Sequence, residues 1–274
     1  MEKNSKKHIL NLIGILLMIL ITSKIILKNN EISQIFNILS NINIKYIVLA
    51  ISCMIIFWIL ETGMISVLVT SFTGKNYNIK TIWISIKTTL IGQYYSNITP
   101  FASGGQPVQL YIMKKDGISL SNGTAVLVSK FLLFQIGVTL YCIILSVIKL
   151  NWIISDIKSV SYFIFIGLII NFTGLSFITL LVFKPKLLSR IIYSIIKNMC
   201  KINIIKNEDE KKEKASKFIK EYETSINKLK QNKRTTLGLF LVTFIQLTVF
   251  FSITFFIYKS LGLSGVAIYK IIAL

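Results

Sequence analysis

Long apolar stretches, separated by short polar segments, follow one another along most of the chain. A helix needs about 20 apolar residues to cross the hydrocarbon layer of a bilayer, which is about 30 Å thick. Stretches of that kind cover residues 9–27, 47–70, 125–148, 162–183 and 236–258. This pattern predicts an all-α fold: a polytopic integral membrane helix bundle that forms a single domain over residues 1–274. A further apolar run starts at residue 266 and reaches Leu274 before it could cross, so we expect a truncated span there.

The stretch 82–113 departs from this pattern. It holds two shorter apolar pieces, residues 82–98 and 108–113, divided by a break that contains Pro100, Pro107 and two adjacent glycines. Proline removes a backbone donor and stops a helix. Two arrangements fit these pieces. They form a re-entrant broken-helix pair that enters and leaves on one side, or the stretch makes a complete extra crossing.

The distribution of charge favours the re-entrant pair. Residues 184–235 carry 15 Lys/Arg against 6 Asp/Glu, a net charge of +9. Cytoplasmic loops are the ones enriched in Lys and Arg, so we expect this basic segment and the lysine-containing N-terminus inside the cell. Five spans plus a re-entrant pair place both of them in the cytoplasm. One extra crossing would place the basic segment outside.

The basic segment itself is predicted to be helical. Apolar pairs recur every three to four residues from Leu187 to Ile196, with Lys and Arg between them. That is typical of an interfacial amphipathic helix that lies on the cytoplasmic membrane face, its basic side on anionic headgroups. A second helix is predicted after Glu208, with an apolar stripe that includes Tyr222 and Ile226. The alternative is that the basic residues of this segment are the ordinary positive charge of a cytoplasmic loop and recognise no specific lipid.

Composition removes most other classes of protein. With a net charge of +20 and 53% hydrophobic residues, the chain is too apolar for a basic nucleic-acid binder, and we expect no DNA partner. His8 is the only histidine and the three cysteines form no CxxC pair, so neither a histidine-dependent catalytic triad nor a His/Cys metal cluster can be assembled. The chain also lacks a phosphate-binding GxxxxGK[ST] loop. We therefore expect no metal and no cofactor.

The break within residues 82–113 is the candidate functional site. Irregular backbone at membrane depth is tolerated only where it is buried in protein or lines a wet cavity. A helix that begins near Gln106 would also direct its first N–H groups into the break, which favours an anion such as a lipid phosphate. The candidate headgroup-binding residues are Asn97, Thr99, Pro100, Ser103, Gly104, Gly105, Gln106 and Gln109. The alternative is a loop that merely reverses the chain.

Three ionisable residues fall inside apolar stretches. Charges within spans are costly, so each one is a functional hypothesis. Glu61 lies within the second predicted span, and Lys87 and Lys130 flank the break. We expect Glu61 to pair with Lys130 or with Lys87 beside the candidate cavity. The alternative for each lysine is that its side chain reaches the cytoplasmic interface.

The sequence GQYYSNITPFASGGQPVQLY at residues 92–111, followed by KKDGI at 114–118 and by Val128-Ser129-Lys130, resembles the lysylphosphatidylglycerol synthase transmembrane-region family. This is the flippase-like membrane domain of the bacterial multiple peptide resistance factor, and the motif is similar to its stand-alone Gram-positive branch. The resemblance implies a multi-pass protein of the bacterial cell membrane that handles aminoacylated phosphatidylglycerol and is linked to cationic antimicrobial peptide resistance. By motif position, it assigns the site to Asn97, Pro100, Gly104, Gly105, Gln106 and Gln109.

Two features depart from the family pattern. In the family, lysyl transfer from lysyl-tRNA to phosphatidylglycerol takes place in a separate soluble domain, which this sequence lacks, and a second glycine-rich break in a later span is also missing. We therefore expect a lipid-binding or lipid-translocating domain without a covalent step. Its expected partners are the membrane, an anionic phospholipid (phosphatidylglycerol or lysyl-phosphatidylglycerol) and, by homo-oligomerisation, further copies of itself. The alternatives are the membrane part of a lysyltransferase that acts with a soluble acyltransferase, or a scaffold that transports nothing.

Overall fold

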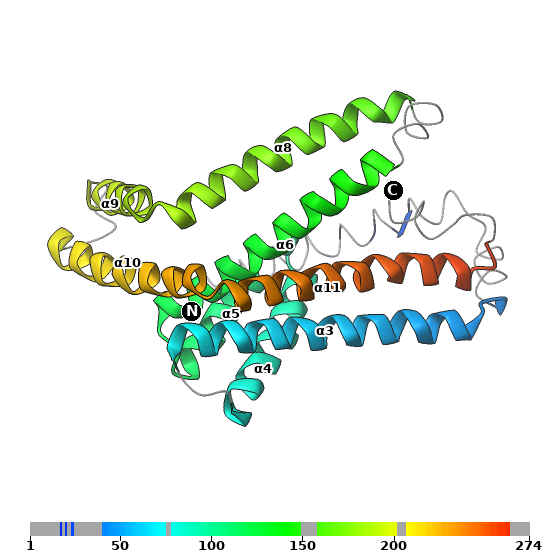
Figure 1. Ribbon diagram of the computed structural model, residues 1–274, viewed down its shortest axis with the longest axis horizontal. Coiled ribbons are helices and arrows are strands. Elements are labelled where there is room, and N and C mark those ends of the chain that lie inside the picture. The colour runs from blue at the N-terminus through cyan, green and yellow to red at the C-terminus, as the bar shows by residue number, and fades with distance from the viewer. Residues whose placement is uncertain are drawn as a thin grey trace.

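The computed structural model describes residues 40–74, 78–148, 158–201 and 207–263, together with four single positions before residue 40. In these residues every regular element is a helix and there is no strand, which confirms the predicted all-α membrane helix bundle (Figure 1). The elements are α3 (Ile44–Thr73), α4 (Ile79–Ile98), the short 3-10 helix η1 (Pro100–Ala102), α5 (Gly105–Lys115), α6 (Leu120–Ile148), α8 (Lys158–Phe183), α9 (Pro185–Lys201), α10 (Glu208–Gln231) and α11 (Lys233–Ser260).

Helices α3 and α11 form the long antiparallel pair at the centre of the bundle (Figure 1). The N–H of Asn43 donates to the carbonyl of Ser260 at one end. Further along, the rings of Phe57 and Phe250 lie 5.3 Å apart, and the hydroxyl of Thr243 donates to the sulfur of Met64. The register is therefore continuous over most of both helices.

Three described helices are long and apolar enough to cross a membrane, namely α3, residues 120–145 of α6, and α11. They contain the predicted stretches 47–70 and 236–258 and most of 125–148. Helix α8 covers the predicted stretch 162–183, and its strongly apolar part, Ile166–Leu180, is shorter. The predicted span 9–27 and the run from residue 266 lie outside the described residues, apart from single positions in the former.

The stretch 82–113 forms a helical hairpin. Helix α4 ends at Ile98, the chain turns through η1, and α5 runs back along α4. Helix α5 has 11 residues, about 16 Å at 1.5 Å per residue, which is too short to cross a layer about 30 Å thick. This is the antiparallel geometry that a re-entrant pair requires.

The basic segment 184–235 contains α9 and α10, which pack against each other. Helix α10 also contacts the ends of two bundle helices. The hydroxyl of Ser225 donates to Asn122 at the start of α6, 2.7 Å away. The ammonium of Lys228 donates to the carbonyl of Phe72 in the last turn of α3, at 3.0 Å. Helix α10 therefore holds these ends of α3 and α6 together.

Tyr222 is buried where α10 meets the bundle, with 3% of its surface exposed. Burial raises the pKa of Tyr222 to about 12 because it disfavours the charged phenolate. The unfolded chain loses this proton near pH 10, so the folded state binds more protons between pH 10 and 12, and stability falls as the pH rises through that window. We expect the wild type to lose about 2 kcal/mol relative to Tyr222→Phe between pH 9 and 12. Thermal unfolding of both proteins across this range measures the difference, and parallel profiles would contradict the prediction.

Candidate functional site

Two glycines let the arms of the hairpin lie in close contact. A Cβ on Gly105 of α5 would overlap the hydroxyl of Ser96 on α4 and lie 3.0 Å from the carbonyl oxygen of Gly92. A Cβ on Gly92 would overlap the side chain of Gln109. Gln109 is buried, and its amide Nε2 donates to the carbonyl of Thr88 at 3.2 Å. Glycine at positions 92 and 105 thus sets the distance between the helices and, through it, the position of Gln109.

The tip of the hairpin is closed by its own hydroxyl groups. The hydroxyl of Thr99 donates to the carbonyl of Tyr95 at 2.6 Å and accepts from the N–H of Gly104 at 2.9 Å. The hydroxyl of Ser103 donates to the carbonyl of Pro100 at 2.9 Å. These bonds satisfy backbone groups where α4 stops and α5 has not yet begun, so the tip has a defined turn structure.

The tip also contains two residues in the left-handed backbone region, Phe101 with φ 55° and Ala102 with φ 54°. The side chain of Phe101 is fully exposed. This conformation costs about 1–2 kcal/mol per residue for an amino acid with a Cβ. We expect Ala102→Gly to stabilise the protein by about 1 kcal/mol or less, because glycine removes the strain but adds freedom to the unfolded chain. Chemical unfolding in detergent tests this, and a loss of stability would contradict it.

Next to the hairpin, a buried polar group links three bundle helices. Glu61 of α3 pairs with Lys130 of α6, with 2.5 Å between Oε1 and Nζ, and both side chains are largely buried. The other carboxylate oxygen accepts from Nε2 of Gln246 on α11 at 2.8 Å. Of the two predicted partners for Glu61, the structure selects Lys130. Lys87 instead pairs with Asp116 at the base of the hairpin, with 2.5 Å between Nζ and Oδ2.

A cavity of about 300 Å³ joins the hairpin to the Glu61–Lys130 pair. Phe57, Phe131 and Phe134 form part of its apolar wall. Its polar lining comes from α3, α4, α5 and α6 and consists of Glu61, Gln93, Ser96, Gln106, Gln109, Lys130 and Gln135. It therefore presents one cation, one anion and several neutral amides inside an apolar bundle. This donor set can bind a polar or zwitterionic group, and it contains no nucleophile activated by a base.

The structure distributes the predicted headgroup-binding residues over three places. Gln106 and Gln109 line the cavity. Gly105 is buried between the arms of the hairpin, and Thr99 and Gly104 form the tip. Pro100 and Ser103 also belong to the tip, Asn97 lies in the last turn of α4, and none of these three exposed residues lines the cavity.

Several polar residues at this site were missed by sequence reasoning. Ser96 and Gln135 line the cavity, and Gln246 binds Glu61 from α11. Gln135 and Gln246 are uncharged amides inside apolar stretches, and that was the one signal available, because buried polar groups in spans usually have partners. Among the described residues, no group of three or more His, Cys, Asp or Glu side chains could hold a metal ion.

The model of one protein family, described as lysylphosphatidylglycerol synthase TM region, matches residues 10–274. The chain belongs to this family. No curated protein and no solved structure matches the chain. As a member of a family defined by the transmembrane region of a lipid synthase, it is a membrane protein whose family is linked to lysylphosphatidylglycerol. Within this family member, the motif at residues 92–111 forms the hairpin that lines one side of the cavity.

The Lys87–Asp116 pair gives a prediction about the base of the hairpin. Both side chains are partly exposed, 32% and 22%, so solvent weakens their attraction. We expect Lys87→Met to cost less than about 1 kcal/mol of stability. Thermal unfolding of the purified protein measures this cost. A larger loss would mean that the pair is essential for closing the hairpin.

Proposed function

We propose that this protein binds phospholipid and translocates it across the bacterial cell membrane, with the lipid headgroup held in the cavity between the α4–α5 hairpin and the Glu61–Lys130 pair. The observation that carries this proposal is the cavity itself, which brings a buried ion pair and four glutamines together between helices of the bundle. Polar groups there are costly unless they serve a substrate pathway or bind one another.

The chemistry of the lining suits a charged headgroup. The ammonium of Lys130 can bind a lipid phosphate, and the carboxylate of Glu61 can bind a cationic substituent. The amides of Gln106 and Gln109 can donate to and accept from glycerol and ester oxygens. Aminoacylated phosphatidylglycerol, such as lysyl-phosphatidylglycerol, combines all of these groups. We propose it as the lipid, with a role in resistance to cationic antimicrobial peptides.

The proposed mechanism has no covalent step. The cavity opens alternately toward the two leaflets and shields the headgroup from hydrocarbon, while the acyl chains stay in the membrane. The Gly92 and Gly105 contacts keep the two arms of the hairpin together as one unit, so the hairpin can move relative to α3 and α6 as a single body. In the proposed topology the protein is multi-pass, and α9, α10 and the N-terminus are cytoplasmic.

Translocation in proteoliposomes tests the proposal. A quencher that cannot cross the membrane is added outside vesicles that contain fluorescent phosphatidylglycerol or lysyl-phosphatidylglycerol. Lipid in the outer leaflet is quenched at once, and the slow phase that follows reports movement of lipid from the inner leaflet. We expect Gln106→Ala to slow translocation by about tenfold, the effect of losing one to two hydrogen bonds. Asn97→Ala is the matched control, since Asn97 is exposed on the same hairpin outside the cavity. Equal rates in wild type and Gln106→Ala, or no translocation by the wild type, would reject it.

A second candidate is the membrane part of a phosphatidylglycerol lysyltransferase that acts with a separate soluble acyltransferase. The description of the family as part of a synthase favours it. In that case the cavity would hold phosphatidylglycerol as acceptor or its product. Lysyl-phosphatidylglycerol that forms only when the chain is co-expressed with a soluble acyltransferase would support this candidate, and formation by the soluble protein alone would reject it.

A further inference from the structure

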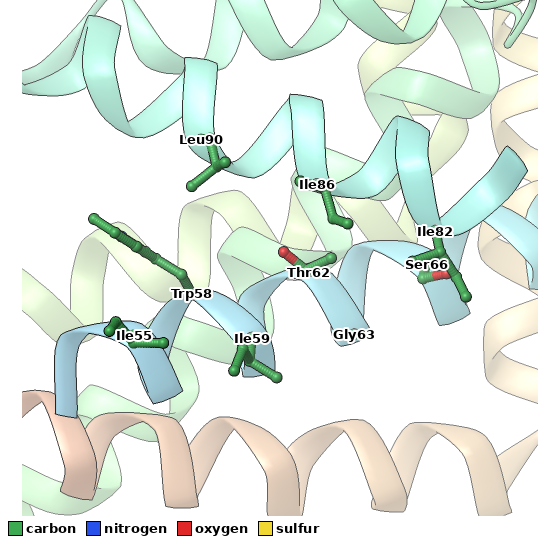
Figure 2. A pocket seen from close by; sticks show the side chains of 9 residues that line it. All are labelled: Ile55, Trp58, Ile59, Thr62, Gly63, Ser66, Ile82, Ile86 and Leu90. Atoms are coloured by element: carbon green, nitrogen blue, oxygen red, sulfur yellow. The ribbon is translucent and has the colours of Figure 1, made fainter. Parts of the chain in front are cut away.

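A second hollow lies between α3 and α4, on a different side of α3 from the cavity. Its volume is about 430 Å³. Ile55, Trp58, Ile59 and Gly63 on α3 line it together with Leu90, Ile86 and Ile82 on α4 (Figure 2). At its rim, the apolar side chains of Ile55, Ile59 and Leu90 are 49%, 64% and 46% exposed. In a membrane protein, exposed apolar side chains of this kind face lipid, so the hollow is a groove that is open to the bilayer.

We infer that this groove binds one acyl chain of a phospholipid. The inference rests on the proposed function for the nature of the ligand, and it extends that function from the headgroup to the tail. From Ile55 to Ser66 the groove follows α3 over about 16 Å at 1.5 Å per residue, close to half of a hydrocarbon layer about 30 Å thick. One lipid tail spans the same depth.

Two polar atoms in the wall of the groove distinguish it from a plain apolar surface. The hydroxyl of Ser66, in a residue 1% exposed, and the indole N–H of Trp58 are both buried and have no hydrogen-bond partner among the residues that the structure describes. An unmatched buried donor costs about 1–3 kcal/mol. Lipid ester carbonyls only accept hydrogen bonds and occur at the head of an acyl chain, so an ester group in the groove would remove that cost once either side chain rotates toward it.

A narrow contact separates the groove from the headgroup cavity. The hydroxyl of Thr62, which lines the groove, donates to the hydroxyl of Thr89 on α4 at 3.1 Å. Glu61, the preceding residue, lines the cavity. The two spaces therefore lie on adjacent faces of α3, and a lipid could place its tail on one side of this contact and its headgroup on the other.

Gly63 offers a direct way to block the groove. It lines the groove, and a Cβ added there meets no atom within 4 Å. Gly63→Phe should therefore fill the space without disturbing the packing of the helix. Gly63 also lines a neighbouring hollow between α3 and α11, which includes Gly238 of α11. A Cβ on Gly238 is equally unobstructed, so Gly238→Phe is the matched control that fills only that second hollow.

The experiment uses the full chain in phosphatidylcholine vesicles that contain phosphatidylglycerol with a photoreactive diazirine in one acyl chain. After illumination, mass spectrometry locates the labelled peptides. We expect label on residues 55–66 of α3 and 82–90 of α4. Gly63→Phe should reduce this labelling about tenfold, the effect expected if the acyl chain loses contact with the groove over about two methylene groups. Gly238→Phe should leave the labelling unchanged.

Three results would overturn the inference. Label could be absent from both segments, or Gly63→Phe and Gly238→Phe could reduce it equally. Alternatively, a cysteine placed at Ile59 could form a disulfide with one placed in the apolar run 9–27, which would show that the chain itself covers the groove. If label is absent but Gln106→Ala still slows translocation, the tail site alone is wrong. If both effects are absent, the proposed function fails as well.

Discussion

Lys130→Met is expected to destabilise the protein by about 3–5 kcal/mol, more than any other single substitution considered for the bundle. The change removes the cation but keeps an unbranched side chain of similar length. Glu61, with 7% of its side chain exposed, would then be left as a buried carboxylate with only the amide of Gln246 as partner. Thermal or chemical unfolding of the protein in detergent micelles measures the loss.

Two controls separate the buried charge from other effects of this substitution. Lys87→Met removes a lysine from a more exposed pair and should cost less than about 1 kcal/mol. The double variant Glu61→Gln with Lys130→Met removes both charges and should recover most of the lost stability, because no charge remains buried without a partner. If the double variant were as unstable as Lys130→Met alone, packing around Lys130 would be the cause.

Gly105→Ala is the second large expected effect. The added Cβ would overlap the hydroxyl of Ser96 and lie 3.0 Å from the backbone oxygen of Gly92, so α5 must move away from α4. Overpacking of this kind costs about 1–3 kcal/mol. Because α5 carries Gln106 and Gln109, its movement should also reduce lipid translocation by about tenfold or more, which the proteoliposome assay measures.

Gly167→Ala in α8 is the matched control, since a Cβ there meets no atom within 4 Å. It should leave translocation unchanged. Adding Ser96→Gly to Gly105→Ala removes the side chain that the new methyl group overlaps, so this double variant should recover part of the lost rate. Normal translocation by Gly105→Ala alone would contradict the account of the hairpin.

Hydropathy was sufficient to predict the fold class, because a bilayer requires continuous apolar helices. The pattern therefore marked the residues that became α3, α6 and α11. The same rule predicted a break at residues 99–107, where proline and glycine interrupt an apolar stretch, and in the structure the turn between α4 and α5 covers residues 99–104 because α5 already begins at Gly105. These features depend on local composition, which a single sequence carries.

The contacts between helices were harder to predict, because they depend on the rotation and register of each helix. The sequence allowed Glu61 to pair with Lys87 or Lys130, and only the packing of α6 against α3 distinguishes the two. Gln246, 185 residues from Glu61, carries no local sign of that contact. The same limit applies to the hairpin, where helical phase turns Gln109 inward and leaves Asn97 exposed.

A lipid headgroup that occupies the cavity beside Gln106 should protect that position from chemical labelling, and this protection is the most direct test of the proposed site. The native residues Cys53, Cys142 and Cys200 are replaced by serine, and Gln106→Cys and Asn97→Cys are labelled with a small water-soluble thiol reagent. We expect Gln106→Cys to be labelled about tenfold more slowly in vesicles that contain lysyl-phosphatidylglycerol than in vesicles of phosphatidylcholine alone. A tenfold decrease corresponds to a cavity that the lipid headgroup occupies about 90% of the time. Labelling of Asn97→Cys should not change. Equal labelling of Gln106→Cys with and without the lipid would contradict the proposed site.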